Sequence, residues 1–469
     1  MQESGPAPAP APAPAPTRVR ASFQRFVHAQ STGGLFLLFC TIVALAWKNS
    51  AWGPSYDHLW ELRLTVGLDG WSLSKSLHHW INDALMGLFF FVVGLEIKRN
   101  VVVGELSSPS KALVPFAAAI GGMVVPIAIY WLVASGSGNG RGWAIPMATD
   151  IAFALGILAL LGPRIPIGLK VFLTALAIVD DIGGVLVIAL FYAEKIAWTP
   201  LLIAAGLWIT MIGSNSLGIR RPLPYFLLGT ALWLCFLKSG VHPTVAGMLG
   251  ALTIPVRTKI NEKQFAEKCR QWLDHFELLG RSGAGALVNA EQRAVFKHIE
   301  TLNAQAQSPL HRLEHSLHPW VSFGVMPIFA LANAGLDLGG SSGENWVHPV
   351  SIGIAVGLAG GKFLGVFGAT WLVVRSGLCK LPSGVGWNHI AGAAILAGVG
   401  FTMSLFISGL AFGSDAELVA RAKSGILMGS IVSGLVGYAV LYRTSPLPPP
   451  ESVAPAEPAA VGPNHGSPA

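Results

Sequence analysis

About a dozen apolar runs of roughly 17–25 residues recur between Gly34 and Leu441, and they constrain the fold more than any single motif does. A helix of about 20 apolar residues is long enough to cross the hydrocarbon core of a bilayer. Of the 469 residues, 52% are hydrophobic and only 12% are charged, a composition outside the range of soluble domains. The sequence therefore predicts an all-α polytopic membrane protein with about twelve transmembrane helices.

The basic residues indicate how these helices are oriented. If the N-terminus is cytoplasmic and the chain changes sides at each span, 22 of the 31 lysines and arginines fall in cytoplasmic segments. Without the long segment from Arg257 to Arg312, cytoplasmic basic residues still outnumber the others by 13 to 8. The positive-inside rule thus explains the net charge of +7 without nucleic-acid binding. It predicts a multi-pass membrane protein with both termini in the cytoplasm.

Composition divides the chain into three regions. Residues 1–21 contain an Ala-Pro repeat and residues 444–469 are rich in Pro and Ala, so we expect both tails to be disordered. Residues 22–443 form the membrane domain. Within it, residues 257–318 are polar, with apolar side chains at helical spacing, and we expect them to form a cytoplasmic helical hairpin docked on the membrane domain.

A second connection has the pattern of a β-hairpin. Gly67-Leu68-Asp69-Gly70 separates two short segments of alternating residues, Leu62–Val66 and Trp71–Leu73. Asp-Gly between such segments is a strong signal for a tight turn. We therefore expect a small extracytoplasmic β-hairpin at residues 62–73.

Charged residues interrupt the apolar runs at four places, which are Asp83, Thr149-Asp150, the adjacent pair Asp180-Asp181, and Lys362. A charged side chain at the centre of a bilayer costs at least about 2.5–3.5 kcal/mol. Buried salt bridges that only fix the order of the helices would explain Lys362 and one acid. A structural role would also explain Asp83, because it lies near the end of a span. Four carboxylates against one lysine, however, leave negative charges that need protons or cations, which indicates ion transport.

The positions of these residues suggest how they meet. Asp180 and Asp181 lie about 100° apart around a helix, so one can face a water-filled cavity while the other faces a neighbouring helix. Lys362 lies in a row of glycines four residues apart, which lets another helix approach closely. The lysine can then bridge to an aspartate across that contact. The glycines are Gly353, Gly357, Gly361 and Gly365.

Long stretches of the chain resemble the NhaA-type sodium/proton antiporters, from about Ser22 to Arg443. The matching motifs are Trp80–Arg99, Trp143–Leu161, Ala175–Tyr192, Lys238–Gly247, Arg312–Val321 and Gly398–Phe412. This resemblance implies a fold of inverted three-helix repeats in which two broken helices cross at mid-membrane. The segments around Thr149-Asp150 and Gly398–Thr402 occupy the places of the two broken helices.

The resemblance also implies roles for the charged residues. Asp180 and Asp181 match the ion-binding carboxylates, with Asp181 as the direct sodium ligand, and Lys362 matches the lysine that pairs with the acid at position 180. Asp150, next to Thr149, would compensate the positive ends of the broken helices, and Lys362 the negative ends. Exchange would then be competition between sodium and protons at one site.

Further residues match positions that the family uses for its response to pH. They are Glu96, Arg99, His242, Glu314, His315 and His318. Interfacial salt bridges would also explain the cytoplasmic group, and a polar helix cap would explain His242. The chain departs from the family at Asn100, because the family usually has a glutamate directly after Lys-Arg. This difference puts in doubt the pH at which the protein becomes active more than it puts in doubt transport itself.

The predicted function is therefore a secondary antiporter that exports Na+ or Li+ in exchange for protons. It is not an enzyme, and we expect no cofactor. The resemblance also implies a location in the bacterial cytoplasmic (inner) membrane and a homodimer through the hairpin at residues 62–73. An intramembrane aspartyl protease would need a Gly-x-Gly-Asp motif, which the sequence lacks, and a cation channel would need no Lys–Asp pair. A sodium-coupled solute symporter of the same fold remains an alternative.

Overall fold

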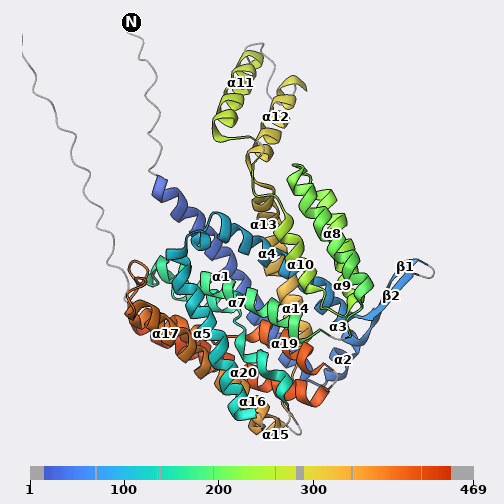
Figure 1. Ribbon diagram of the computed structural model, residues 1–469, viewed down its shortest axis with the longest axis vertical. Helices are drawn as coiled ribbons and strands as arrows, with labels where there is room; N and C mark the ends of the chain where they lie inside the picture. The colour runs from blue at the N-terminus through green and yellow to red at the C-terminus, as the bar shows by residue number, and fades with distance from the viewer. Residues whose placement is uncertain are drawn as a thin grey trace, which may run out of the picture.

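The computed structural model describes residues 15–444 apart from 69–70, 135, 137–138, 194, 259, 281–289, 340–341 and 414. In these residues the chain is helical except for one two-stranded antiparallel sheet (Figure 1). The longer elements are α1 (Ala15–Lys48), α2 (Gly53–Glu61), β1 (Arg63–Leu68), β2 (Trp71–Ser76), α3 (Leu77–Trp80), α4 (Met86–Val102), α5 (Pro109–Ala134), α6 (Ile151–Leu160), α7 (Ile167–Phe191), α8 (Trp198–Ser216), α9 (Pro222–Ser239), α10 (Thr244–Thr253), α11 (Glu262–Gly280), α12 (Ala290–Ala306), α13 (Pro309–Trp320), α14 (Met326–Asn333), α15 (Ser342–Val347), α16 (Pro349–Val356), α17 (Lys362–Arg375), α18 (Trp387–Leu396), α19 (Phe401–Phe412) and α20 (Ala416–Thr444).

The N-terminal boundary differs from the prediction. α1 begins at Ala15, so residues 15–21 are helical although we expected them to belong to the disordered tail. Pro16 does not prevent this, because the N–H groups of the first helical turn have no partner within the helix. The remainder of the predicted tails, residues 1–14 and 445–469, lies outside the described residues.

Six helical segments of the described chain are long and apolar enough to cross a membrane, and eight are if each of two bent helix pairs forms one span. This count by length and composition is lower than the expected twelve. One reason is that α10 has only 10 residues. Another is that α13, which continues through a π-helical segment, η6 (Val321–Val325), into α14, is polar, with Arg312, Glu314 and three histidines.

Small residues let the helices pack closely, as is usual between membrane helices. A Cβ atom on Gly365 of α17 would lie 2.1 Å from the carbonyl oxygen of Gly121 of α5. A Cβ on Gly247 of α10 would lie 2.2 Å from the carbonyl oxygen of Gly87 of α4. Any larger residue at these positions would force the helices apart. The row of glycines beside Lys362 therefore brings α17 directly against α5.

Large apolar side chains also cover the outside of the helical body. Leu132, Leu190 and Leu202 are 83%, 73% and 70% exposed, and many other Leu, Ile, Val and Phe side chains are similar. A soluble protein rarely exposes so much contiguous apolar surface. These side chains suit contact with lipid, in agreement with the predicted membrane protein.

The predicted β-hairpin is present. β1 and β2 pair antiparallel from Arg63 opposite Ser76 to Leu68 opposite Trp71, and the turn at residues 69–70 lies outside the described residues. Figure 1 shows the hairpin projecting from one end of the molecule. We call this the hairpin end.

The predicted helical hairpin within residues 257–318 also forms, as α11 and α12, but its expected docking on the membrane domain is wrong. Figure 1 shows both helices projecting from the top of the molecule, away from the β-hairpin at its right side, and we call the part from which they project the insertion end. The two helices pack on each other, with the Trp272 and His298 rings stacked at 4.2 Å. At the base of this pair the Ile260 N–H, just before α11, donates to the Gln305 carbonyl of α12. The apolar faces of the two helices are thus satisfied mainly by each other.

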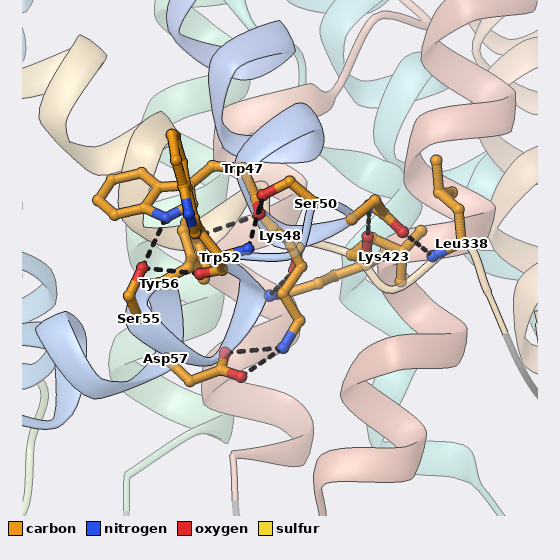
Figure 2. Close-up of polar contacts among 12 residues, drawn as sticks. Trp47, Lys48, Ser50, Trp52, Ser55, Tyr56, Asp57, Leu338 and Lys423 are labelled. Atoms are coloured by element: carbon orange, nitrogen blue, oxygen red, sulfur yellow. Dashed lines mark hydrogen bonds and ion pairs between the residues drawn. The ribbon is translucent and has the colours of Figure 1, made fainter.

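At the hairpin end, polar contacts fasten the connection between α14 and α15 (Figure 2). α1 and α2 meet at an angle of 112°, and Lys48 pairs with Asp57 across this corner at 2.6 Å. Asn49 in the corner donates to the Leu336 carbonyl at 2.7 Å, and its side-chain oxygen accepts from the Leu338 N–H. From the other side, Lys423 of α20 donates to the Gly335 carbonyl at 3.1 Å. The connection is therefore held by two different parts of the helical body.

Candidate functional site

Two interrupted helices meet in the middle of the molecule. The first consists of a 3-10 segment, η4 (Gly140–Met147), followed by α6, and the second consists of α18 and α19, bent by 42°. The Asp150 N–H donates to the Val399 carbonyl at 2.7 Å, and the Thr149 hydroxyl donates to the Ala397 carbonyl at 2.9 Å. The interruptions therefore touch each other and satisfy backbone groups that the broken helices leave without a helical partner.

Asp150 caps the N-termini of both α6 and α19. One carboxylate oxygen accepts from the Phe153 N–H at 3.0 Å. The other accepts from the Thr402 N–H at 3.0 Å and also from the Thr402 hydroxyl. A negative charge is favourable at these two helix starts because each carries partial positive charge. Since both oxygens of this buried side chain are occupied, Asp150 is suited to hold the crossing together.

The adjacent aspartates of α7 lie beside this crossing and have different surroundings. Lys362, which is completely buried, donates to Asp180 Oδ2 at 2.7 Å. A π-helical segment, η7 (Gly357–Gly361), directly precedes the lysine, so the helix register changes where the side chain enters the core. Asp180 is thus neutralised by a partner from a distant part of the sequence.

Asp181 has no such cation. It is 4% exposed, and its Oδ2 atom has no hydrogen-bond partner among the described residues. It lines a cavity of about 60 Å³ together with Thr149, Asp150, Glu96 and His318. A buried carboxylate oxygen without a partner, next to a small cavity whose walls are mostly apolar, can bind either a proton or a cation.

Some of the residues predicted to respond to pH lie together at the insertion end. Arg99 of α4 contacts Glu314 of α13 at 3.2 Å and Glu96 at 3.9 Å. His318 and Glu96 line the same cavity as Asp181. His315 instead faces a separate pocket, and it is one helical turn from His311, with the two rings 6.3 Å apart. The acids and His318 can therefore act on Asp181 more directly than His315.

His242 lies apart from this group, toward the hairpin end. Its Nε2 atom is 3.6 Å from Asp83 Oδ1, and Lys75 of β2 donates to Asp83 Oδ2 at 2.7 Å. Asp83 is therefore bound to the hairpin and to the start of α10. The structure thus separates the predicted pH-response residues into two groups on opposite sides of the crossing.

Thr402 is the part of the site that the sequence did not single out. It lies within the recognised stretch Gly398–Phe412, but its contact to Asp150 joins residues 252 positions apart. The signal available in the sequence was a hydroxyl residue directly after a helix interruption. Asn100, the departure from the family, donates to the Glu96 carbonyl at 2.9 Å within its own helix.

Comparison with known proteins agrees with this geometry. The chain matches the family described as Na+/H+ antiporter 1 over residues 24–441. The Na(+)/H(+) antiporter NhaA of Oleidesulfovibrio alaskensis is 47% identical over 424 residues, which cover 90% of this chain and 94% of that protein. The chain belongs to the NhaA family of Na+/H+ antiporters. The NhaA of Koribacter versatilis is 49% identical over 430 residues, covering 91% of this chain and 92% of the relative. NhaA 1 of Saccharophagus degradans is 46% identical over 427 residues, with coverage of 91% and 92%.

The family assignment confirms the resemblance found in the sequence. It favours an antiporter over the solute symporter that shares this type of fold, since each of these relatives is named as a Na+/H+ antiporter. It also confirms a multi-pass membrane protein of a transporter family rather than of an enzyme family. The match spans the whole membrane domain, including α7, α17 and both interrupted helices.

Proposed function

We propose that this protein exchanges Na+, or Li+, for protons at Asp181. The observation that carries the proposal is the buried Asp181 oxygen without a partner, which lies at the wall of the cavity beside the helix crossing. A protonated Asp181 is neutral and can remain in this apolar surrounding. When Na+ enters, the carboxyl group releases its proton and the carboxylate binds the cation, so that the charge remains compensated.

The neighbouring groups support this exchange, but they do not themselves exchange a proton for a cation. Lys362 keeps Asp180 paired, which removes one negative charge from the site. The Thr149 side chain supplies a neutral oxygen in a residue that lines the cavity, and oxygen ligands suit a hard cation. Asp150 and Thr402 hold the two interrupted helices in place. We assign Asp180 and Lys362 to the ion-binding centre and Asp150 to its positioning.

Transport requires that the site opens to one side at a time. We propose the architecture of the family, with twelve spans in inverted three-helix repeats, in which the bundle that carries the crossing moves against the remaining helices. The insertion end is the cytoplasmic side and the hairpin end is extracytoplasmic, as the distribution of basic residues predicts. The inner membrane is the proposed location, with both termini cytoplasmic.

Two features of the proposal concern energy and assembly. If more than one proton moves per sodium ion, each net charge gains about 2.3 kcal/mol per 100 mV of membrane potential. The group Glu96, Arg99, Glu314 and His318 would adjust activity to cytoplasmic pH, because charges there act on the cavity. We also propose a homodimer through the hairpin at residues 62–73, whose strands project beyond the helical body.

Titration calorimetry of the purified protein with NaCl tests the site. We expect Na+ binding to release protons, so that the measured heat varies with the ionisation enthalpy of the buffer. Asp181→Asn removes the titrating group at nearly constant volume and is expected to abolish both binding and proton release. Sodium-driven dequenching of a pH-sensitive dye in inverted vesicles is expected to disappear in the same variant.

Asp274→Asn is the matched control, because Asp274 is an exposed aspartate of α11 far from the crossing. It is expected to bind sodium and release protons as the unmodified protein does. Full exchange activity in Asp181→Asn would show that the site lies elsewhere. Sodium binding without proton release in any buffer would refute the exchange mechanism itself.

A further inference from the structure

Four aromatic rings from four segments meet next to the helix crossing. The ring of Phe406 on α19 lies 5.8 Å from that of Phe90 on α4 and 6.3 Å from that of Phe329 on α14. The His242 ring, just before α10, lies 5.2 Å from Phe406 at an angle of 79°. Phe90 and Phe329 are completely buried and Phe406 is 3% exposed. We call these three phenylalanines and His242 the aromatic cluster.

The aromatic cluster lies between the ion site and the hairpin end. Thr402, which binds Asp150, and Met403, which lines the cavity, are in the first turn of α19. Phe406 follows one turn later, about 6 Å farther along the helix from Thr402. On its far side, His242 contacts Asp83, which is bound to Lys75 of the hairpin.

The cavity itself reaches in the other direction. Its lining includes Glu96 and His318, which belong to the insertion end, but none of the four residues of the aromatic cluster and not Asp83. The cavity beside Asp181 therefore extends toward the cytoplasmic side, and the aromatic cluster lies on its other side. The closed side is the one that Phe406 occupies.

A cluster of this kind is a strong barrier to ions. A hydrated cation cannot pass through tightly packed phenyl rings without losing water, and apolar constrictions in ion pathways close by excluding water. An unpaired charge within such packing is costly. The polar groups on either side, Asp181 and Asp83, can hold ions, but the rings between them cannot.

We propose that Phe406 is the extracytoplasmic gate of the exchanger, with Phe90 and Phe329 as the walls against which it closes. The proposal rests on the alternating-access function and on the orientation given above. Because Phe406 and Thr402 share one helix, a displacement of α19 relative to α4 and α14 moves the gate and the crossing together. Opening toward the hairpin end then requires that Phe406 leave the other two rings.

The test compares proton influx with sodium efflux in proteoliposomes loaded with radioactive Na+, with the membrane potential clamped. Phe406→Ala removes the seal, so sodium is expected to leak without proton exchange, and the ratio of protons to sodium ions is expected to fall by roughly twofold or more. Phe406→Leu keeps a large apolar side chain and is expected to retain the ratio. Phe329→Ala removes a wall instead of the gate and is expected to lower the ratio as well, which preserves the test if Phe406→Ala does not fold.

Phe172→Ala is the control for packing alone. Phe172 is buried to a similar degree, but it lies in a separate apolar cluster with Leu155 and Ile390. It is expected to lower the rate or the thermal stability without changing the ratio. If Phe406→Ala and Phe329→Ala behave like Phe172→Ala while the unmodified protein exchanges normally, the gate is refuted. If the unmodified protein shows no exchange, the proposed function fails, and the gate fails with it.

Discussion

Removing Lys362 while keeping Asp180 tests whether the buried ion pair is required for a stable fold. The Lys362 side chain is 0% exposed and that of Asp180 is 1% exposed, and they meet at 2.7 Å. Water cannot replace the lysine at this depth, and Asp180 Oδ1 already lacks a hydrogen-bond partner among the described residues. Lys362→Met, which has a similar length, therefore leaves a carboxylate without any compensating charge.

Breaking a buried pair in this way costs about 3–5 kcal/mol, whereas replacing both partners by neutral residues is often close to neutral. We expect Lys362→Met to lower the melting temperature of the purified protein clearly and the double variant Asp180→Asn/Lys362→Met to recover most of the loss. Protonation of Asp180 would also remove the unpaired charge, so the loss is expected to decrease as the pH is lowered.

Thermal unfolding in detergent, followed by tryptophan fluorescence across a pH series, measures both effects. Lys423→Met is a useful comparison, because Lys423 of α20 donates a hydrogen bond to the backbone carbonyl of Gly335 and not to Asp180. It is not expected to be rescued by Asp180→Asn. A Lys362→Met variant as stable as the unmodified protein, or a double variant no more stable than the single one, would refute the reasoning.

Two further predictions concern the crossing and the hairpin end. Thr402→Val removes the hydroxyl donor to Asp150 at constant shape, and it is expected to lower the free energy of unfolding by about 1–3 kcal/mol and to weaken the apparent sodium affinity in the dye assay. Thr402→Ser keeps the hydroxyl and is expected to retain the stability and the affinity. Equal behaviour of the two variants would contradict the role of the hydroxyl. His348, just before α16, accepts from the Val350 N–H, and burial together with Arg421 lowers its pKa from 6.5. Folding thus favours the neutral form of His348. Its contribution to the free energy of unfolding is present above about pH 6.5 and is lost as the pH falls below that value. We expect His348→Asn, which caps the helix at every pH, to lose less thermal stability between pH 8 and pH 5 than the unmodified protein does.

The local features were the ones that could be predicted from the sequence. The alternating residues on either side of Asp69-Gly70 predicted the antiparallel pairing of β1 and β2, because the signal for a β-hairpin lies within a few neighbouring residues. The helical spacing within residues 257–318 likewise predicted α11 and α12. It did not determine whether they dock on the body, because an amphipathic face can be buried against the partner helix as well as against the membrane domain.

The site was accessible to sequence reasoning only in part. The angle of about 100° between adjacent residues explains why Asp180 and Asp181 have different surroundings. It does not indicate which of them meets Lys362, since the lysine is 182 positions from Asp180 along the chain. The same limit applies to Thr402 and Phe406, whose partners lie on other helices. Periodicity predicts the face of a helix on which a residue lies, and only the packing of helices determines what that face contacts.

The difference between Asp150 and Asp181 explains how one site can be both rigid and exchangeable. Asp150 has both oxygens bound to groups that are part of the protein, so it does not need a cation. Asp181 has an oxygen without a partner and borders a cavity, so its charge must be compensated by something that enters. Asp180 could not serve this purpose while Lys362 is bound to it. An adjacent pair on one helix therefore allows one carboxylate to anchor α7 against α17 while the other alternates between a proton and a cation.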